Sequence, residues 1–172
     1  SNHRTDRYGG SQENRIRFLA DVAEAVAGEI GADRTGIRLS PYITQRNMAD
    51  DEIIDTILKA AKELDRIGLV YIHLSEADWD DAPQVPEQFR HDLRAVYSGN
   101  IIVAGKYTKE RATAILNAGL ADIIAFGRPF IANPDLPRRV IEDLPLAEFD
   151  GATLFGGTKE GYSSYPAWES AA

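Results

Sequence analysis

The feature that most constrains the fold is a fourfold alternation of strand-like and helix-like segments. Short apolar segments, rich in β-branched residues and bounded by Gly or Pro, recur at intervals of roughly thirty residues, the size of a βαβ unit. The predicted strands are 35–41, 69–76, 100–107 and 121–127, and the predicted helices are 12–30, 51–67, 87–97, 109–118 and 134–144. Alternation of this kind predicts an α/β fold with parallel strands and helices packed outside them.

Capping residues mark most of the predicted helix ends. The expected N-caps are Ser11, Asp50, Thr108 and Asn133, and Gly31, Gly68 and Gly119 follow three helices at their C-terminal ends. Apolar residues at helical spacing predict the buried faces. In the first helix that face comprises Ile16, Leu19, Val22, Ala23, Val26 and Ile30, and in the fourth helix it includes Leu116.

Two architectures fit the alternation: a doubly wound open sheet and a TIM barrel. A complete barrel needs eight units and about 250 residues. This chain has 172 residues and opens with a loop and a helix, so it supplies only half of the strands. The pattern therefore indicates part of a barrel if the barrel interpretation holds.

Composition narrows the possible partners. The net charge of −8 argues against a nucleic-acid groove or an anionic membrane surface. The chain has no cysteine, and His3, His73 and His91 are scattered, so we expect no metal site. His73 lies within an apolar strand and is expected to be a hydrogen-bonded core residue rather than a base. Without a membrane-length apolar run or a signal peptide, the chain is expected to be soluble and cytoplasmic.

The last two predicted strands end in the same way, with a glycine followed by a cation. Gly105 precedes Lys106, and Gly127 precedes Arg128. In TIM barrels the chemistry lies at the C-terminal ends of the strands, and the loops after the last two strands often bind phosphate. Glycine leaves backbone N–H groups approachable, and the cations add charge. These residues predict a phosphate site, although tight turns with solvated cations would give the same pattern.

Several longer motifs resemble the Old Yellow Enzyme family of FMN-dependent ene-reductases. These are SNHRTDRYGGSQENRIRF, RTGIRLSP, VAGKYT, DIIAFGRPFIANPDLP and FGGTKEGYSSYP, in the family's order and at similar spacing. The resemblance runs from Asn2 almost to the C-terminus. Family members are (β/α)8 barrels, so it implies that residues 1–172 form the C-terminal half of one barrel domain, its fifth to eighth strands with their helices and the C-terminal tail.

The resemblance also implies residue roles. Arg38 matches the arginine that faces the pyrimidine edge of the flavin, where a guanidinium stabilises the reduced cofactor; without the resemblance, Arg38 would be expected to pair with a carboxylate. Gly105, Lys106, Gly127 and Arg128 match the positions that bind the FMN phosphate. Trp79 and Phe155 are expected on the substrate side, and Phe155 stands where many relatives carry tyrosine.

The family's catalytic groups are not expected in this chain. The carbonyl-binding His pair and the proton-donating tyrosine lie before it in the family. The resemblance therefore implies an enzyme that takes hydride from NAD(P)H and reduces activated alkenes only when a separate N-terminal half completes the barrel. Two alternatives remain: a phosphate-binding half-barrel of another TIM-barrel enzyme, and a self-associating half-barrel without catalysis.

Overall fold

The computed structural model describes residues 2–43, 50–76, 84–155 and 158–169. They form two compact units, 1–125 and 126–172. The first unit contains α1 (Gln12–Ile30), η1 (Ala32–Arg34), β1 (Gly36–Leu39), α2 (Ile53–Ile67), β2 (Tyr71–Ser75), α3 (Glu87–Val96), β3 (Asn100–Ala104), α4 (Lys109–Asn117) and β4 (Ile123–Ala125). The second contains α5 (Arg128–Ala132), α6 (Leu136–Ile141) and η3 (Gly151–Thr153).

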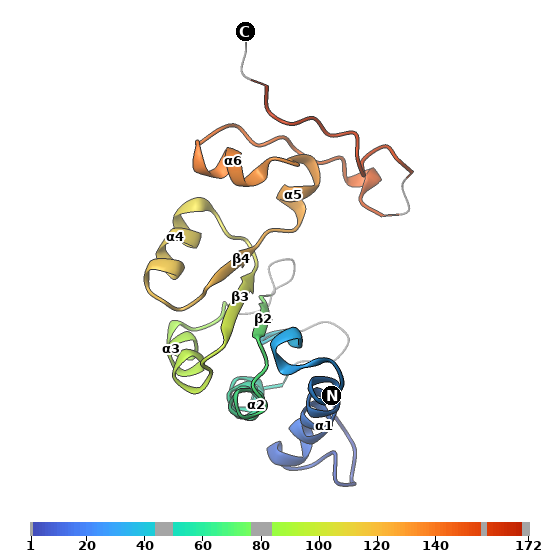
Figure 1. Cartoon of the computed structure of the whole chain (residues 1–172), viewed down its shortest axis with the longest axis vertical. Coiled ribbons are helices and arrows are strands. Elements are labelled where there is room, and N and C mark those ends of the chain that lie inside the picture. Colours follow the sequence, from blue (N-terminus) through green and yellow to red (C-terminus); the bar gives the residue numbers. More distant parts are fainter. Residues whose placement is uncertain (1, 44–49, 77–83, 156–157, 170–172) are drawn as a thin grey trace. The chain divides into compact units, whose positions relative to one another are not determined.

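The sheet of the first unit is parallel, and its strand order follows the chain. The order is β1-β2-β3-β4. Because parallel crossovers are right-handed, strands added in one direction place their connecting helices on one face. Figure 1 shows α3 and α4 on the same side of the strands. A doubly wound sheet reverses its strand order, so the observed order favours the barrel type of winding.

Burial alternates along the two central strands and distinguishes the two faces of the sheet. Ile72, Leu74, Ile101 and Val103 are at most 1% exposed and form the core under the helices. On the other face Tyr71 is 36% and Ile123 is 49% exposed. The described helices therefore cover one face, and we call the other the open face of the sheet.

The predicted apolar face of α1 is wrong in its outer part. Ala23 is buried, but Val22, Val26 and Ile30 are 39–50% exposed. The helix contacts α2 through the rest of that face, near which Lys59 of α2 donates a hydrogen bond of 2.7 Å to Glu13. Nothing in the described part of the chain covers the three exposed side chains. The buried position expected for Leu116 of α4 is wrong too, because this side chain is 40% exposed.

Two of the four predicted N-caps are confirmed. The side chains of Ser11 and Thr108 accept hydrogen bonds from the first turns of α1 and α4. The cap predicted at Asp50 is wrong because α2 begins at Ile53, so this carboxylate accepts instead from the N–H of Glu52 in the preceding turn. The cap predicted at Asn133 is also wrong. The helix α6 begins at Leu136, and the Asn133 side chain forms its hydrogen bonds with the backbone of Pro129 and Ala147 instead.

Candidate functional site

Arg38 of β1 lies on the open face of the sheet. Its Nη2 donates a hydrogen bond of 2.8 Å to Oγ of Ser75, a buried residue at the end of β2. The alternative prediction, an arginine paired with a carboxylate, is wrong for the described residues, among which Arg38 forms no ion pair. Ser75 thus orients this guanidinium without neutralising it, which leaves its charge available to an anionic group.

His73 is the register partner of Arg38 on the neighbouring strand. Its Nε2 is buried and has no hydrogen-bond partner among the described residues, so the hydrogen bond expected for His73 is not formed at this nitrogen. Burial lowers the pKa of His73, and the positive charge of Arg38 lowers it further. The imidazole is therefore held neutral beside the guanidinium.

Gly105 and Lys106 form a turn directly after β3. A methyl group on Gly105 would lie 3.3 Å from Cβ of Glu76, so the close approach of the two chain segments favours glycine there. Lys106 is exposed, and α4 begins three residues later with its N-terminus capped by Thr108. The turn thus brings together a side-chain cation and a helix N-terminus, two features that attract anions.

A buried polar cluster that the sequence analysis missed supports this turn. Glu76 is 6% exposed and follows β2 directly. Its carboxylate accepts hydrogen bonds from both terminal nitrogens of Arg90 at 2.9 Å, from the Tyr107 hydroxyl at 2.7 Å and from Nη2 of Arg111 at 2.8 Å. In the sequence, the one sign of this cluster is a glutamate directly after an apolar strand. Exposed loop residues commonly occupy such positions too, so the pattern does not predict a buried cluster.

The charges of this cluster act on one another. Burial raises the pKa of Tyr107, and the hydrogen bond to Glu76 raises it further, so the phenol stays protonated. Burial acts to lower the pKa of Arg90, but hydrogen bonds and charge from Glu76 outweigh it and raise the pKa. One carboxylate faces two guanidinium groups, so the cluster carries a net charge of about +1 beneath the turn.

Gly127 and Arg128 lie in the second unit. Gly127 is exposed and precedes α5, a five-residue helix that was not predicted, with Arg128 as its first residue and Pro129 in its first turn. Nothing lies within 4 Å of the position that a methyl group on Gly127 would take. The backbone here is therefore open to approach.

Asn133 fixes the far end of α5. It is fully buried; its Nδ2 donates to the carbonyl oxygens of Pro129 at 2.7 Å and Ala147 at 3.0 Å, and its Oδ1 accepts from the N–H of Ala147 at 2.8 Å. The side chain therefore joins the helix that carries Arg128 to a segment fourteen residues away.

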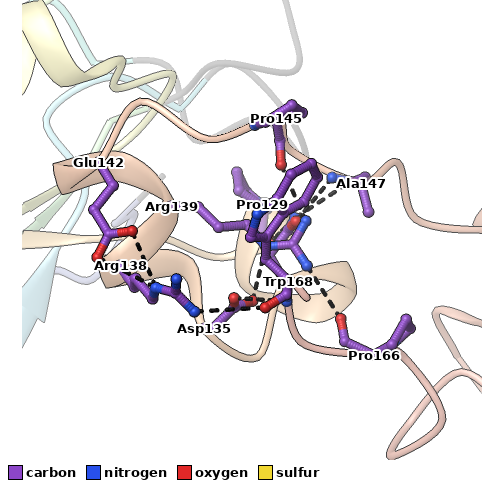
Figure 2. A network of polar contacts seen from close by, with 10 residues as sticks. Pro129, Asp135, Arg138, Arg139, Glu142, Pro145, Ala147, Pro166 and Trp168 are labelled. Carbon is purple, nitrogen blue, oxygen red and sulfur yellow. Dashed lines mark hydrogen bonds and ion pairs between the residues drawn. The ribbon is translucent and has the colours of Figure 1, made fainter. Parts of the chain in front are cut away.

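Arg139 of α6 holds the C-terminal segment in the same unit (Figure 2). Its guanidinium donates to Asp135 at 2.7 Å and to the carbonyl oxygens of Pro145 and Pro166, and it lies 5.8 Å from the ring of Trp168. Asp135 also accepts from the N–H of Trp168 at 2.8 Å. This N–H contributes most to lowering the pKa of Asp135, and Arg139 lowers it further against the opposing effect of burial. The tail is thereby fastened to α6.

The predicted site residues divide between the two units. Arg38, Gly105 and Lys106 belong to the first, and Gly127 and Arg128 to the second. Phe155, in the second unit, is 89% exposed. Trp79 lies outside the described residues. Among described side chains no group of three His, Asp or Glu could hold a metal ion, and none of the described helices has the length and apolar character needed to cross a bilayer.

Comparison with known proteins identifies the family. The sequence profile of the NADH:flavin oxidoreductase / NADH oxidase family matches residues 1–147. The chain is 37% identical over 174 residues to 12-oxophytodienoate reductase 2 of Arabidopsis thaliana, with 99% of this chain and 46% of that protein covered. It is 38% identical over 178 residues to 12-oxophytodienoate reductase 1 of Oryza sativa subsp. japonica, covering 96% and 45%.

Solved structures agree. Morphinone reductase in complex with tetrahydroNAD matches with a TM-score of 0.90 and 46% identity, over 98% of this chain and 45% of that one. The Old Yellow Enzyme homologue from Zymomonas mobilis matches with a TM-score of 0.89 and 39% identity, over 97% and 48%.

These matches and the parallel α/β architecture define a flavin oxidoreductase fold of the TIM-barrel type. The chain belongs to the NADH:flavin oxidoreductase / NADH oxidase family, to which Old Yellow Enzyme belongs. It spans about half the length of the relatives that it matches.

Proposed function

We propose that this chain is the C-terminal half of an FMN-dependent ene-reductase barrel, and that it works together with an N-terminal half. The observation that carries the proposal is Arg38, a cation without a carboxylate partner among the described residues, held by Ser75 on the open face of the sheet. In a closed barrel that face is the interior, where a cofactor above the strand ends would meet the guanidinium.

The residues present fit a phosphate-bearing flavin. Gly105 lies in the turn after β3, the backbone at Gly127 is open to approach, and each glycine is followed by an exposed cation, Lys106 or Arg128. We assign these four residues to the phosphate and Arg38 to the flavin ring. A fixed positive charge at the ring favours the anionic, reduced state of the cofactor. FMN, when bound, would accept hydride from a nicotinamide and pass it to an activated alkene.

The open face and the exposed side of α1 support the need for a second half. An uncovered sheet face with exposed Tyr71 and Ile123 would be covered when four more strands close the barrel. Val22, Val26 and Ile30 would pack against a neighbouring helix of the outer ring. The carbonyl-binding and proton-donating groups would come from the N-terminal half, whereas Trp79 and Phe155 would border the substrate pocket.

The same open face favours one competing function. An uncovered apolar surface also promotes self-association, and two copies of a half-barrel could close one sheet. A colourless homodimer that remains colourless when the N-terminal half is supplied would favour this non-catalytic role. Phosphate affinity without flavin affinity would instead favour a different phosphate-binding barrel.

The role of Arg38 gives the most specific test of the proposal. With the N-terminal half present, Arg38→Met should lower the flavin reduction potential by tens of millivolts because the reduced cofactor loses its countercharge. Arg34→Met removes an exposed arginine of η1 and is the matched control. Equal potentials in the two variants would show that Arg38 does not face the flavin ring.

A further inference from the structure

We propose that Glu76 is a positioning residue for phosphate: it holds the turn 105–107 in place through Tyr107 and Arg111. The inference rests on the proposed function, because it concerns the same phosphate site. Glu76 itself is buried, so it acts through the residues that it fixes and needs no contact with the ligand.

The backbone of Glu76 is anchored to the strand that leads into the turn. Its N–H donates a hydrogen bond of 2.9 Å to the carbonyl oxygen of Ala104, the last residue of β3. The β2–β3 pairing therefore extends to the residue that precedes Gly105. As a result, the carboxylate starts from a fixed point next to the turn.

The side chain of Glu76 then fixes the other end of the turn. Its Oε1 accepts the hydrogen bond of the Tyr107 hydroxyl, and the Tyr107 ring is buried. The methyl position on Gly105 would be 3.3 Å from Cβ of Glu76 and 3.7 Å from the Tyr107 ring. Gly105 is thus enclosed by the two side chains, which restricts the path of the backbone.

Arg111 joins the turn to the carboxylate a second time. Its guanidinium lies 4.1 Å from the centroid of the Tyr107 ring, donates to the carbonyl oxygen of Lys106 at 3.2 Å and donates to Glu76 at 2.8 Å. With this carbonyl held toward Arg111, the orientation of the following peptide N–H is fixed as well, since the peptide unit is planar.

Arg90 accounts for the charge of the cluster. It pairs with both carboxylate oxygens of Glu76 and is itself buried, so burial of the carboxylate is compensated. Arg111 then adds a second positive charge on the side of the turn. The resulting net positive charge favours an anion at the turn. A buried pair of one carboxylate and one guanidinium would be neutral and would not attract an anion in this way.

The test compares FMN with riboflavin, which lacks the phosphate, on the chain combined with its N-terminal half. Tyr107→Phe removes only the hydroxyl that Glu76 holds, and Glu76→Gln removes the charge. Tyr97→Phe is the matched control, because the Tyr97 hydroxyl is also buried and donates to a backbone carbonyl oxygen, that of Leu69. Hydrogen exchange of residues 104–112, measured on the chain itself, reports the order of the turn without any ligand.

We expect Tyr107→Phe to weaken FMN binding by about threefold to tenfold, the effect of one lost hydrogen bond, and riboflavin binding by less than about twofold. Exchange in residues 104–112 should accelerate in this variant and in Glu76→Gln, and stay unchanged in Tyr97→Phe. If the native protein prefers FMN but Tyr107→Phe and Tyr97→Phe keep that preference equally, the positioning role is overturned. If the native protein does not distinguish FMN from riboflavin, the phosphate site of the proposed function fails instead.

Discussion

The ring of Tyr71 on β2 lies directly over Gly36 on β1, its register partner, on the open face of the sheet. A methyl group on Gly36 would overlap the ring atoms at well under van der Waals distance. Glycine at position 36 therefore lets the Tyr71 ring lie across β1, two residues before Arg38 of the same strand. Local packing at this face depends on a small residue opposite a large one, as in the interior layers of barrels.

Replacing Gly36 tests that packing. Gly36→Ala should displace the Tyr71 ring and lower the free energy of unfolding by about 1 kcal/mol, because the ring must swing aside. Gly28→Ala in α1 is the control; nothing lies within 4 Å of its added methyl group, and the helix should gain roughly 0.5–1 kcal/mol. Chemical denaturation measures both. A neutral or stabilising Gly36→Ala would contradict the packing described.

The exposed stripe of α1, formed by Val22, Val26 and Ile30, gives a prediction about assembly. Val26→Glu should barely change the stability of the isolated chain, by less than about 0.5 kcal/mol, because Val26 is exposed in it. It should strongly weaken association with the N-terminal half, where a buried unpaired charge is costly. Gly28→Glu places the same charge about 200° away around the helix and should leave association unchanged. Titration calorimetry with the N-terminal half distinguishes the two variants, and equal affinities would show that the stripe is not an interface.

Asn133 should be required for the stability of the second unit. Asn133→Ala removes three hydrogen bonds and leaves two carbonyl oxygens and one N–H of the backbone without that partner. Unpaired buried polar groups cost about 1–3 kcal/mol each, so we expect a loss of at least about 2 kcal/mol in unfolding free energy. The control Asn117→Ala, at the exposed end of α4, should stay within about 0.5 kcal/mol. Similar losses in both would refute the anchoring role.

Asp122 should make stability depend on pH in the acid range. Burial acts to raise its pKa, but hydrogen bonds from the Ile101 N–H at 2.7 Å and from Arg94 at 2.5 Å outweigh burial and lower the pKa. A pKa that is lower in the folded state stabilises the fold above the unfolded value of about 4, and this contribution is lost as pH falls through the folded value.

Asp122→Asn should therefore be less stable than the native chain at neutral pH, and the difference in their unfolding free energies should become smaller as pH falls below about 4. Arg94→Gln should weaken the same pH dependence because one of the two donors to the carboxylate is lost. Thermal unfolding between neutral and acid pH measures the effect. A stability difference that is constant over this range would contradict the lowered pKa.

The parts of the structure that depend on local sequence were predictable. Ser11 and Thr108 cap helices through contacts three residues away, so the sequence contains all of the information needed. The four parallel strands were likewise confirmed, because each carries its own apolar pattern between turn residues.

The rest depends on distant partners. Asn133 resembles a helix cap in sequence, but its partner Ala147 is fourteen residues away and draws its side chain elsewhere. The stripe of α1 looks like core because helical periodicity shows that a face is apolar, not what covers it. The glycine-cation pairs could be found from strand ends, whereas the Glu76 cluster combines residues from four separate segments and has no motif.

The assignment as the C-terminal half of a flavin barrel is tested by the visible absorption spectrum of this chain after gel filtration with the N-terminal half of a relative such as morphinone reductase. We expect one equimolar complex that retains flavin bands in the blue, whereas each half alone elutes colourless. Failure of the halves to associate, or a stable complex without flavin even after addition of excess FMN, would contradict it.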